Sequence, residues 1–392
     1  MWDKIIHLEK PNTLSQFLSE KEQQEVVSLK ITGLIGRQDF DDVLDYMCDS
    51  CGYYDDDDNY FPDYDMAAAI RHLDLGEAKY VDGDCLPYFG YHSQLESIVL
   101  PKGIKSTLEP GETALAESEN LKTLVLPEGL KKVGGFNSCE KLTGLVLPEG
   151  LEEIESFAFC GCEAITSIKL PKSLKTFDGS CFGGCNIEAY EIDSDNPYYT
   201  AVDGVIYSKD LATLVAFPSA YPNKHFKMPA TTRVIGDSAF MDSQIDSIEL
   251  PDSLTIIEGG AFQGSRIRAM VMPDSITEIG ELTFRWCGEL EHVRLSRSLK
   301  VLPQQAFSGC PKLARLEIPS NIKTIYYLSL LWAGNLNAIM ESAVPPEIKG
   351  ITTINPSYFK TLTVYVPNGA LSAYRNAPGW KNIRIREYKD LK

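Results

Sequence analysis

The chain has 392 residues, and its 55 Asp and Glu residues outnumber its 37 Lys and Arg residues, which gives a formal net charge of −18. So acidic a surface repels the phosphates of nucleic acids and of anionic membranes, which excludes both as expected partners. The apolar fraction of 44% excludes a globally disordered chain.

Neither end nor middle of the chain shows a membrane segment. No stretch approaches the roughly 18 consecutive apolar residues of a spanning helix. Residues 1–7 lack the apolar core of about 7–15 residues that a signal peptide has. Two expectations stay open: an intracellular protein, or a protein whose export signal has been removed.

The first 70 residues are less regular than the rest. Residues 13–19, followed by acidic and Gln residues, predict one or two helices, and residues 26–31 predict a first strand. A further strand is expected at residues 72–75. We interpret residues 1–70 as an N-terminal cap and an atypical first repeat with an acidic insertion, because the end of a repeat array exposes a sheet edge.

The acidic insertion, residues 53–65, raises the question of a metal site. Carboxylates this dense could bind Ca²⁺, but their spacing does not fit an EF-hand loop and no glycine stands at its centre. Cys48 and Cys51 form a C-x-x-C pair without a second ligand pair for zinc or a thioredoxin-like context. A solvated loop is therefore expected, with no metal and no cofactor.

From residue 71 onward a short strand motif recurs. Segments close to L-x-x-L-x-L, with Ile, Val or Met in place of some leucines and most of them ending in proline, occupy residues 95–101, 121–127, 142–148, 165–171, 245–251, 267–273, 290–296 and 313–319. Their last residues are 26, 21 and 23 positions apart in the first block and 22, 23 and 23 apart in the second. This period predicts a leucine-rich-repeat solenoid over residues 71–342, an α/β repeat with parallel strands on one face and few regular helices.

The segments between the strands must close each coil. In residues 149–159 we expect Leu151, Ile154, Phe157 and Phe159 to point inward. An Ala-Phe pair recurs at residues 158–159, 239–240, 261–262 and 306–307, which predicts a stacked aromatic spine.

A column of mostly small residues stands two or three positions before the first Leu or Ile of the strands. Its members are Cys139, Cys162, Cys185, Cys287 and Cys310, with His92, Ser118, Ser243 and Ser265 in other turns. Weak donors at this spacing predict a buried ladder that meets the backbone of the adjacent turn. Neighbours about 4.8 Å apart are within disulfide range, but parallel, inward-pointing side chains favour thiols.

These residues resemble the BspA-like branch of bacterial leucine-rich repeats, whose unit is close to I-x-x-I-x-L-P-x-S-L-x-x-I-G-x-x-A-F-x-G-C. Residues 245–262 are a near match, and the likeness runs from about Leu73 to Ile339 and then into the C-terminal segment. Residues 196–207, continuing to Pro218, resemble the family's inserted hairpin, here placed near 193–222, and Asp203-Gly204 is a hairpin turn signal. Residues 364–370, with Tyr374 and Trp380, resemble its closing unit, so residues 343–392 are expected to form a C-terminal cap.

The resemblance implies a bacterial surface or secreted protein that adheres to host or partner proteins; a cytoplasmic location stays open. The chain contains no G-x-S-x-G, P-loop, H-E-x-x-H or strand-linked G-x-G-x-x-G motif, so a non-enzymatic protein is expected. An extended rigid surface suits large partners, and we expect a monomer that binds a protein ligand. The alternative is a carbohydrate-binding surface protein using Tyr198, Tyr199, Tyr207 and Tyr221 of the inserted hairpin.

A ligand would meet the two outward positions of each strand. The candidate binding residues there are Val99, Val125, Val146, Lys169, Val271, His292, Arg294 and Arg315. The valines form either a partner-binding patch or a file selected for strand propensity. The two arginines either grip a carboxylate together or form a charge ladder with Glu317.

Overall fold

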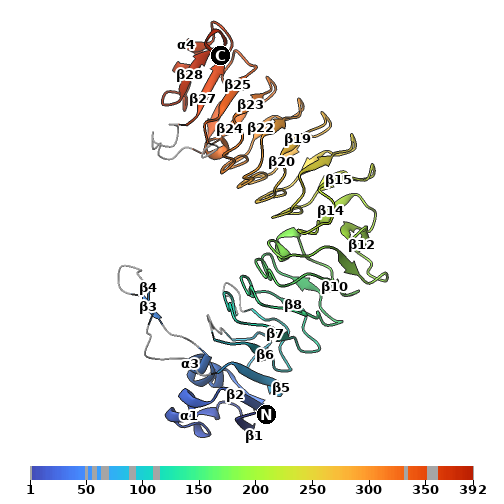
Figure 1. The fold of residues 1–392 in the computed structure, drawn as a ribbon, viewed down its shortest axis with the longest axis vertical. Helices are drawn as coiled ribbons and strands as arrows, with labels where there is room; N and C mark the ends of the chain where they lie inside the picture. Colours follow the sequence, from blue (N-terminus) through green and yellow to red (C-terminus); the bar gives the residue numbers. More distant parts are fainter. Residues whose placement is uncertain are drawn as a thin grey trace. The chain divides into compact units, whose positions relative to one another are not determined.

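The computed structural model describes residues 2–48, 52–54, 60–62, 70–87, 94–108, 115–330, 334–350 and 361–391. Cys51, His92 and most of the acidic insertion lie outside these residues. The chain divides into two compact units, Met1–Tyr198 and Tyr199–Lys392, and each is a stack of short parallel strands (Figure 1). The predicted domain boundaries near residues 70 and 342 stay predictions.

The first unit begins with a mixed segment and continues as a coil. Its elements are β1 (Lys4–Leu8), the 3-10 helix η1 (Leu14–Gln16), α1 (Glu20–Glu25), β2 (Ser28–Ile35), α2 (Arg37–Asp39), the π-helix η2 (Phe40–Leu44), α3 (Asp45–Cys48), β3 (Gly52–Tyr54), β4 (Tyr60–Pro62), β5 (His72–Tyr80), β6 (Ser97–Val99), β7 (Thr123–Val125), β8 (Lys132–Val133), β9 (Glu153–Ile154), β10 (Ile168–Leu170), the 3-10 helix η3 (Gly179–Phe182) and β11 (Tyr190–Ile192). Strands β1, β2, β5, β6 and β7 form one parallel sheet in that order. The helices and the strands predicted near residues 13–31 and 72–75 are confirmed, whereas β1 was not predicted.

The second unit starts with a hairpin and ends with a small helix. Its elements are β12 (Tyr199–Val202), β13 (Val205–Ser208), β14 (Thr213–Ala216), β15 (His225–Lys227), β16 (Val234–Ile235), β17 (Ser247–Glu249), β18 (Ile256–Ile257), β19 (Ala269–Val271), β20 (Glu278–Ile279), β21 (His292–Arg294), β22 (Val301–Leu302), β23 (Arg315–Ile318), β24 (Thr324–Tyr326), the 3-10 helix η4 (Tyr327–Leu330), β25 (Asn337–Met340), β26 (Glu347–Lys349), β27 (Thr363–Val366), α4 (Leu371–Asn376), β28 (Arg384–Glu387) and the 3-10 helix η6 (Tyr388–Asp390). The predicted strands β17, β19, β21 and β23 are confirmed, and they lie in the parallel sheets β15-β17-β19-β21 and β23-β25-β27-β28 together with strands that were not predicted.

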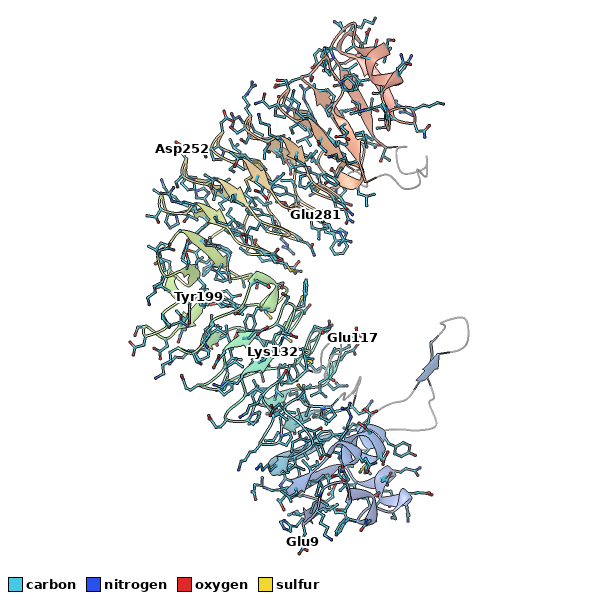
Figure 2. All side chains as sticks on the ribbon, turned by 180° about the vertical axis from the view of Figure 1, so that it is seen from behind. Glu9, Glu117, Lys132, Tyr199, Asp252 and Glu281 are labelled. Carbon is cyan, nitrogen blue, oxygen red and sulfur yellow. The ribbon has the colours of Figure 1, made fainter. Side chains whose placement is uncertain are left out.

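Most turns of the second unit also carry a second strand, often a shorter one, that the sequence did not predict. Strands β14, β16, β18 and β20 pair in parallel, as do β22, β24 and β26. Figure 2 labels one residue after each kind of strand, Asp252 after a predicted strand and Glu281 after a short one, and they lie at opposite edges of the coil. The fold is thus a parallel-strand solenoid with two strands in a turn and helices of at most six residues among those described.

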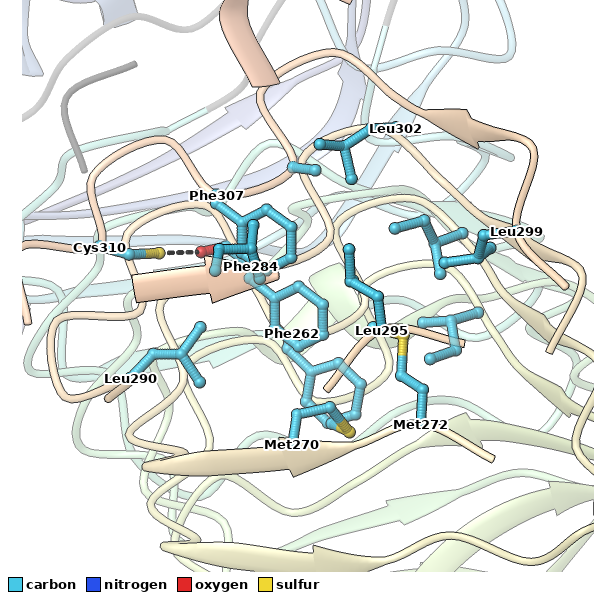
Figure 3. Packing of buried hydrophobic residues seen from close by; sticks show 14 of the residues in the cluster. Phe262, Met270, Met272, Phe284, Leu290, Leu295, Leu299, Leu302, Phe307 and Cys310 are labelled. Atoms are coloured by element: carbon cyan, nitrogen blue, oxygen red, sulfur yellow. Dashed lines mark hydrogen bonds between the residues drawn. The ribbon is translucent and has the colours of Figure 1, made fainter. Parts of the chain in front are cut away.

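The aromatic spine is confirmed in both units. In the first unit Phe159 stacks on Phe136 and Phe182 with ring centroids 5.6 and 5.5 Å away. In the second unit the stack runs through Phe217, Phe240, Phe262, Phe284 and Phe307 with centroid spacings from 4.5 to 5.4 Å. Figure 3 shows three of these rings one above another, surrounded by Leu and Met side chains of the core.

The ladder is confirmed for its cysteines, whose acceptors are now visible, but not for Ser118 and Ser243, whose buried hydroxyls have no hydrogen-bond partner among the residues that the structure describes. Each thiol donates to a carbonyl of the preceding turn, as from Cys162 to Phe136 over 3.2 Å and from Cys310 to Phe284 over 3.0 Å (Figure 3). The remaining donors and acceptors are Cys139 with Leu115, Cys185 with Phe159 and Cys287 with Phe262. Hydrogen bonding to the neighbouring thiol, and then burial, raise the pKa of Cys162 and of Cys310, so these groups stay protonated donors.

Two expectations for the first unit were wrong. Phe157 does not point inward: its side chain is 49% exposed because its backbone adopts a left-handed φ of 62° that turns it away from the core. Residues 142–148 form no strand, and Gly144 there has a φ of 62°, outside the β region.

The inserted hairpin is confirmed. Strands β12 and β13 pair in antiparallel fashion around Asp203 and Gly204, whose φ values of 51° and 77° fit a type I′ turn. Strand β14 then pairs with β13 on one side and with the solenoid strand β16 on the other. The hairpin therefore continues directly into the second sheet of its unit.

The C-terminal segment packs as expected, although its role as a cap stays a prediction, like that of residues 1–70. Tyr374 and Trp380 lie edge to face with centroids 4.9 Å apart. The Tyr374 hydroxyl donates to the Ser342 carbonyl over 2.8 Å, and the Trp380 indole donates to the Pro346 carbonyl over 2.9 Å. These bonds tie α4 and the chain after it to the preceding turn.

Candidate recognition surfaces

The first unit presents an apolar file on its strand face. Val99 on β6 lies beside Val125 on β7 in register, while their neighbours Ile98 and Leu124 are buried beneath them. Val125 is 45% exposed. The alternation of inward and outward residues predicted from the sequence therefore holds on this sheet.

Val146 is the third valine of the predicted file, but it does not lie on a strand. It is 75% exposed, although residues 142–148 form no strand. A Cβ atom added to the nearby Gly144 would meet no atom within 4 Å, so the surface is open at that position. Strand propensity therefore does not explain why a valine stands here.

Lys169 is the last candidate binding residue of the first unit along the chain. It is exposed on β10, and its register partner on β11 is Glu191. The flanking Ile168 and Leu170 are buried. Lys169 thus gives this end of the strand face a charge, in contrast to the valines.

The strand face of the second unit is mostly charged. Val271 is 64% exposed and lies in register with Arg294, and the exposed His292 lies beside Ala269. Arg294 donates to the Met272 carbonyl over 2.5 Å and pairs with Asp274 over 3.0 Å.

The two arginines of this face each have a carboxylate partner of their own. Arg315 pairs with Glu317 over 3.0 Å. This is the charge ladder that was the alternative to two arginines binding one ligand carboxylate together. A hollow of about 160 Å³ between these turns is lined by Arg294 and Glu317 together with Arg297 and Glu341, which pair over 3.3 Å. Its charges are mutually neutralised, so it offers no net attraction for an ion.

The hairpin tyrosines do not form the predicted aromatic platform. Tyr207 is 1% exposed, because strand β13 directs it into the core of the second unit. Tyr221 packs against Phe217 with centroids 4.8 Å apart. Only Tyr198, at the end of the first unit, is more than one-third exposed.

Sequence reasoning did not single out Trp286, which is 56% exposed. It stands in a column of left-handed residues at the turn edge of the second unit, which we define as Asp242, Gly264, Trp286 and Gly309. The family unit has glycine at this position, in A-F-x-G-C, because left-handed backbone favours glycine. The departure from that motif in residues 284–287 was the signal that could have found Trp286.

Asp242, in the same column, gives a test of the electrostatics of this edge. Burial raises the pKa of its carboxyl, so the ionised form is disfavoured in the folded state. A folded-state pKa above the unfolded value gives stability that is present at low pH and lost as the pH rises through the folded value. Asp242→Asn is therefore expected to stabilise the protein at pH 7 by about 1 kcal/mol or less, since asparagine also tolerates left-handed φ.

The gain from Asp242→Asn should shrink as the pH falls through the raised pKa of the folded state, and it should be absent below the ordinary aspartate pKa of 3.8. Thermal unfolding at pH 7 and at acidic pH measures it. Asp252→Asn, at an exposed site, is the matched control and should show no pH-dependent gain. A gain at Asp242 that is the same at both pH values would contradict the electrostatic explanation.

No metal centre or membrane segment is found in the part of the chain that the structure describes. No three His, Cys, Asp or Glu side chains gather there as they would around a metal ion. None of its helices is long and apolar enough to cross a membrane. The acidic insertion, for which Ca²⁺ binding was weighed, lies largely outside that part.

Solved structures of bacterial repeat proteins resemble this one. A leucine-rich repeat protein from Eubacterium ventriosum is 19% identical over 87% of this chain and 88% of its own, with a TM-score of 0.56, which supports the solenoid fold. The pneumococcal vaccine antigen PcpA is 16% identical over 98% of this chain and 94% of its own, with a TM-score of 0.45. A leucine-rich cell surface protein from Faecalibacterium prausnitzii is 18% identical over 98% of this chain and 79% of its own, with a TM-score of 0.40.

None of the curated proteins compared with the chain matches it. The family model of the BspA type leucine-rich repeat region matches residues 87–200 and 215–336 in six copies, more than half of the chain. The matched residues of this chain include most of the strand motifs, the aromatic spine and the thiol column described above. The chain belongs to the BspA-type leucine-rich repeat family.

Proposed function

We propose that this protein is a non-enzymatic binding protein that recognises a protein partner with the valine surface of its first unit, Val99, Val125 and Val146. Membership of the BspA-type family supports an adhesive role at the cell surface or in the secreted state. Leucine-rich repeat solenoids are typically binding scaffolds, since their extended surfaces suit large partners. We propose that the protein acts as a monomer.

The observation that carries the proposal is the exposure of Val125 and Val146. Two β-branched side chains that are 45% and 75% exposed lose solvent contact when an apolar partner surface covers them. The open position at Gly144 leaves room beside Val146 for a partner side chain. Strand propensity accounts for Val99 and Val125 on their strands but not for Val146, which lies outside any strand.

A charged border runs along one side of this surface. Glu96, the residue before β6, pairs with Arg71 over 3.5 Å and with Lys122 over 2.6 Å. Each of the three residues directly precedes its strand, so together they form a charged row next to the valines. An apolar centre with a polar rim is the usual composition of a protein-binding surface.

The carbohydrate alternative at the inserted hairpin has less support. Of its four tyrosines, Tyr207 is buried and Tyr221 packs into the core, so a sugar ring has no aromatic platform formed by these residues together. The second unit's strand face is also a weaker candidate, because Arg294 and Arg315 are engaged with carboxylates of the same face.

Charge substitutions on the valine surface test the proposal. Val125→Asp and Val146→Asp place a carboxylate at exposed positions, so they should leave the fold intact and weaken partner binding at least about tenfold. Binding of the intact chain to immobilised collagen, laminin and vitronectin is measured by interferometry, with serum albumin as a non-matrix protein. Val344→Asp is the matched control, because Val344 is 74% exposed in the other unit.

The binding results distinguish the valine surface from the strand face of the second unit. Saturable binding to a matrix protein that is lost in both valine variants and kept in Val344→Asp supports the valine surface. Binding that survives in both valine variants and is lost in Arg294→Glu/Arg315→Glu would move the recognition to the second unit. No saturable binding to any of the three matrix proteins counts against the adhesive role.

A further inference from the structure

Trp286 differs from the residues at the same position in the adjacent turns, because it is a large exposed side chain on a left-handed backbone. Its side chain is 56% exposed, and its φ is 61°. The residues in the same column of the adjacent turns are Gly264 and Gly309, which adopt left-handed φ without a steric cost. A bulky residue held in this conformation is an outlier, and such outliers gather at functional sites.

The indole of Trp286 is held in place by its neighbours. The guanidinium carbon of Arg285 lies 3.8 Å from the ring centroid, at cation–π distance. A Cβ atom at Gly309 would come within 2.5 Å of the indole Cδ1 and 3.3 Å of Nε1, so only glycine at that position lets the ring lie across the next turn. A ring fixed before binding loses little conformational entropy when a ligand stacks on it.

A polar hollow lies in the same unit as Trp286, with one lining residue close to it in the chain. It has a volume of about 440 Å³ and is lined by Asp246, Arg266, Arg268 and Glu289. Glu289 follows Trp286 by three residues in the chain, so the Cα atoms of these two residues lie within about 11 Å of each other. Two further charges brace the lining, since Arg268 pairs with Glu291 over 2.8 Å and Lys312 pairs with Glu289 over 2.5 Å.

The chemistry of this lining indicates the class of ligand. Carboxylates only accept hydrogen bonds and guanidiniums only donate them, whereas a hydroxyl group does both. The two acidic and two basic side chains cancel in charge, so the hollow has no preference for an anion or a cation. We propose that Trp286 and this hollow bind a neutral saccharide, whose hydroxyls enter the hollow while its C–H face stacks on the indole.

This saccharide site goes beyond the proposed protein recognition, because it lies in the other unit and uses other residues. Its test uses the intact chain and four soluble probes: cellotetraose, chitotetraose, maltotetraose and mannotetraose. Titration calorimetry gives the dissociation constant, and tryptophan emission shows whether an indole is involved. The expected result is binding of at least one tetrasaccharide with a change in emission.

Trp286→Gly is the decisive variant. Because glycine stands at this position in both adjacent turns, the variant should fold at least as well as the parent chain. It should weaken binding at least about tenfold and abolish the emission change, and Trp286→Phe should retain part of the affinity. Arg266→Ala should also weaken binding, whereas the control Arg233→Ala, which removes an exposed arginine far from the hollow's lining, should not.

Two results would overturn the saccharide site: no binding of any of the four tetrasaccharides at millimolar concentration, or binding that persists unchanged in Trp286→Gly. Val146→Asp separates this proposal from the protein-binding one, because it should leave tetrasaccharide binding unchanged. A loss of matrix-protein binding in Trp286→Gly, without any saccharide binding, would show instead that the turn edge belongs to a protein interface.

Discussion

Replacing Phe159 by alanine is expected to destabilise the first unit by about 3–5 kcal/mol. The ring is fully buried and lies between Phe136 and Phe182, parallel to each within 8°. Its removal takes away the transfer free energy of a buried aromatic side chain and two stacking contacts, and it leaves a cavity that the rigid neighbouring turns fill poorly. In a solenoid each turn rests on its neighbours, so the loss reaches the turns on both sides.

Phe157 provides the matched control, since the same substitution two residues earlier removes a ring that is 49% exposed. Phe157→Ala should change the free energy of unfolding by less than about 1 kcal/mol. Urea denaturation followed by far-ultraviolet circular dichroism measures both variants. Equal losses at the two positions would show that the spine does not carry the stability assigned to it.

The contrast between Phe157 and Phe159 also shows what the sequence reveals. Phe159, the cysteines of the ladder and the strand residues recur at a fixed spacing, and a buried contact repeated in every turn leaves this trace in the sequence. The orientation of Phe157 depends on a left-handed φ that recurs two positions before the spine phenylalanines, at Ser238, Gly260, Leu282 and Gln305. The residue types at this position differ from turn to turn, so the sequence does not reveal the angle. The expected inward orientation was therefore wrong at this residue, while the spine was predicted correctly.

The short second strands of the turns were not predicted, for a related reason. Strands such as β18 and β20 have two residues each, too few to show the alternation of a half-buried strand. Ile257 and Ile279 are apolar and buried, but one inward residue in a turn is equally compatible with an irregular coil. Only the pairing across turns, which a sequence does not display, makes these residues a sheet.

The same difference, between features that repeat in the sequence and features that do not, applies to the candidate surfaces. Alternation on β6 and β7 predicted that Val99 and Val125 face outward, and the register confirms their placement side by side. Their role in binding stays a prediction, as does that of the other strand-face residues. Trp286 was not predicted, because its exposure depends on a left-handed turn and on Gly309 in the next turn, two features separated by 23 residues.

Replacing Asp39 by alanine is the second change with a large expected effect, about 3–5 kcal/mol on the N-terminal segment. The side chain is 1% exposed, and its carboxylate accepts three backbone N–H donors: Asn12 over 2.8 Å, Leu14 over 2.8 Å and Gly36 over 2.9 Å. These bonds join the loop before η1 to the start of α2. Alanine would leave the three donors without an acceptor, and an unsatisfied buried group costs about 1–3 kcal/mol.

Hydrogen exchange locates this effect where global unfolding does not. In Asp39→Ala the amides of Leu14 and Gly36 should exchange much faster, while those of the strands β6 and β7 change little, because the lost contacts are local. Asp42→Ala is the matched control: Asp42 lies three residues away on η2 and is exposed, so its removal should stay within about 0.5 kcal/mol. Leu14 and Gly36 amides that stay protected in Asp39→Ala would mean that the carboxylate does not hold the segment together, and the N-terminal fold would then depend on the packing of its buried apolar residues, among them Phe40 and Leu44.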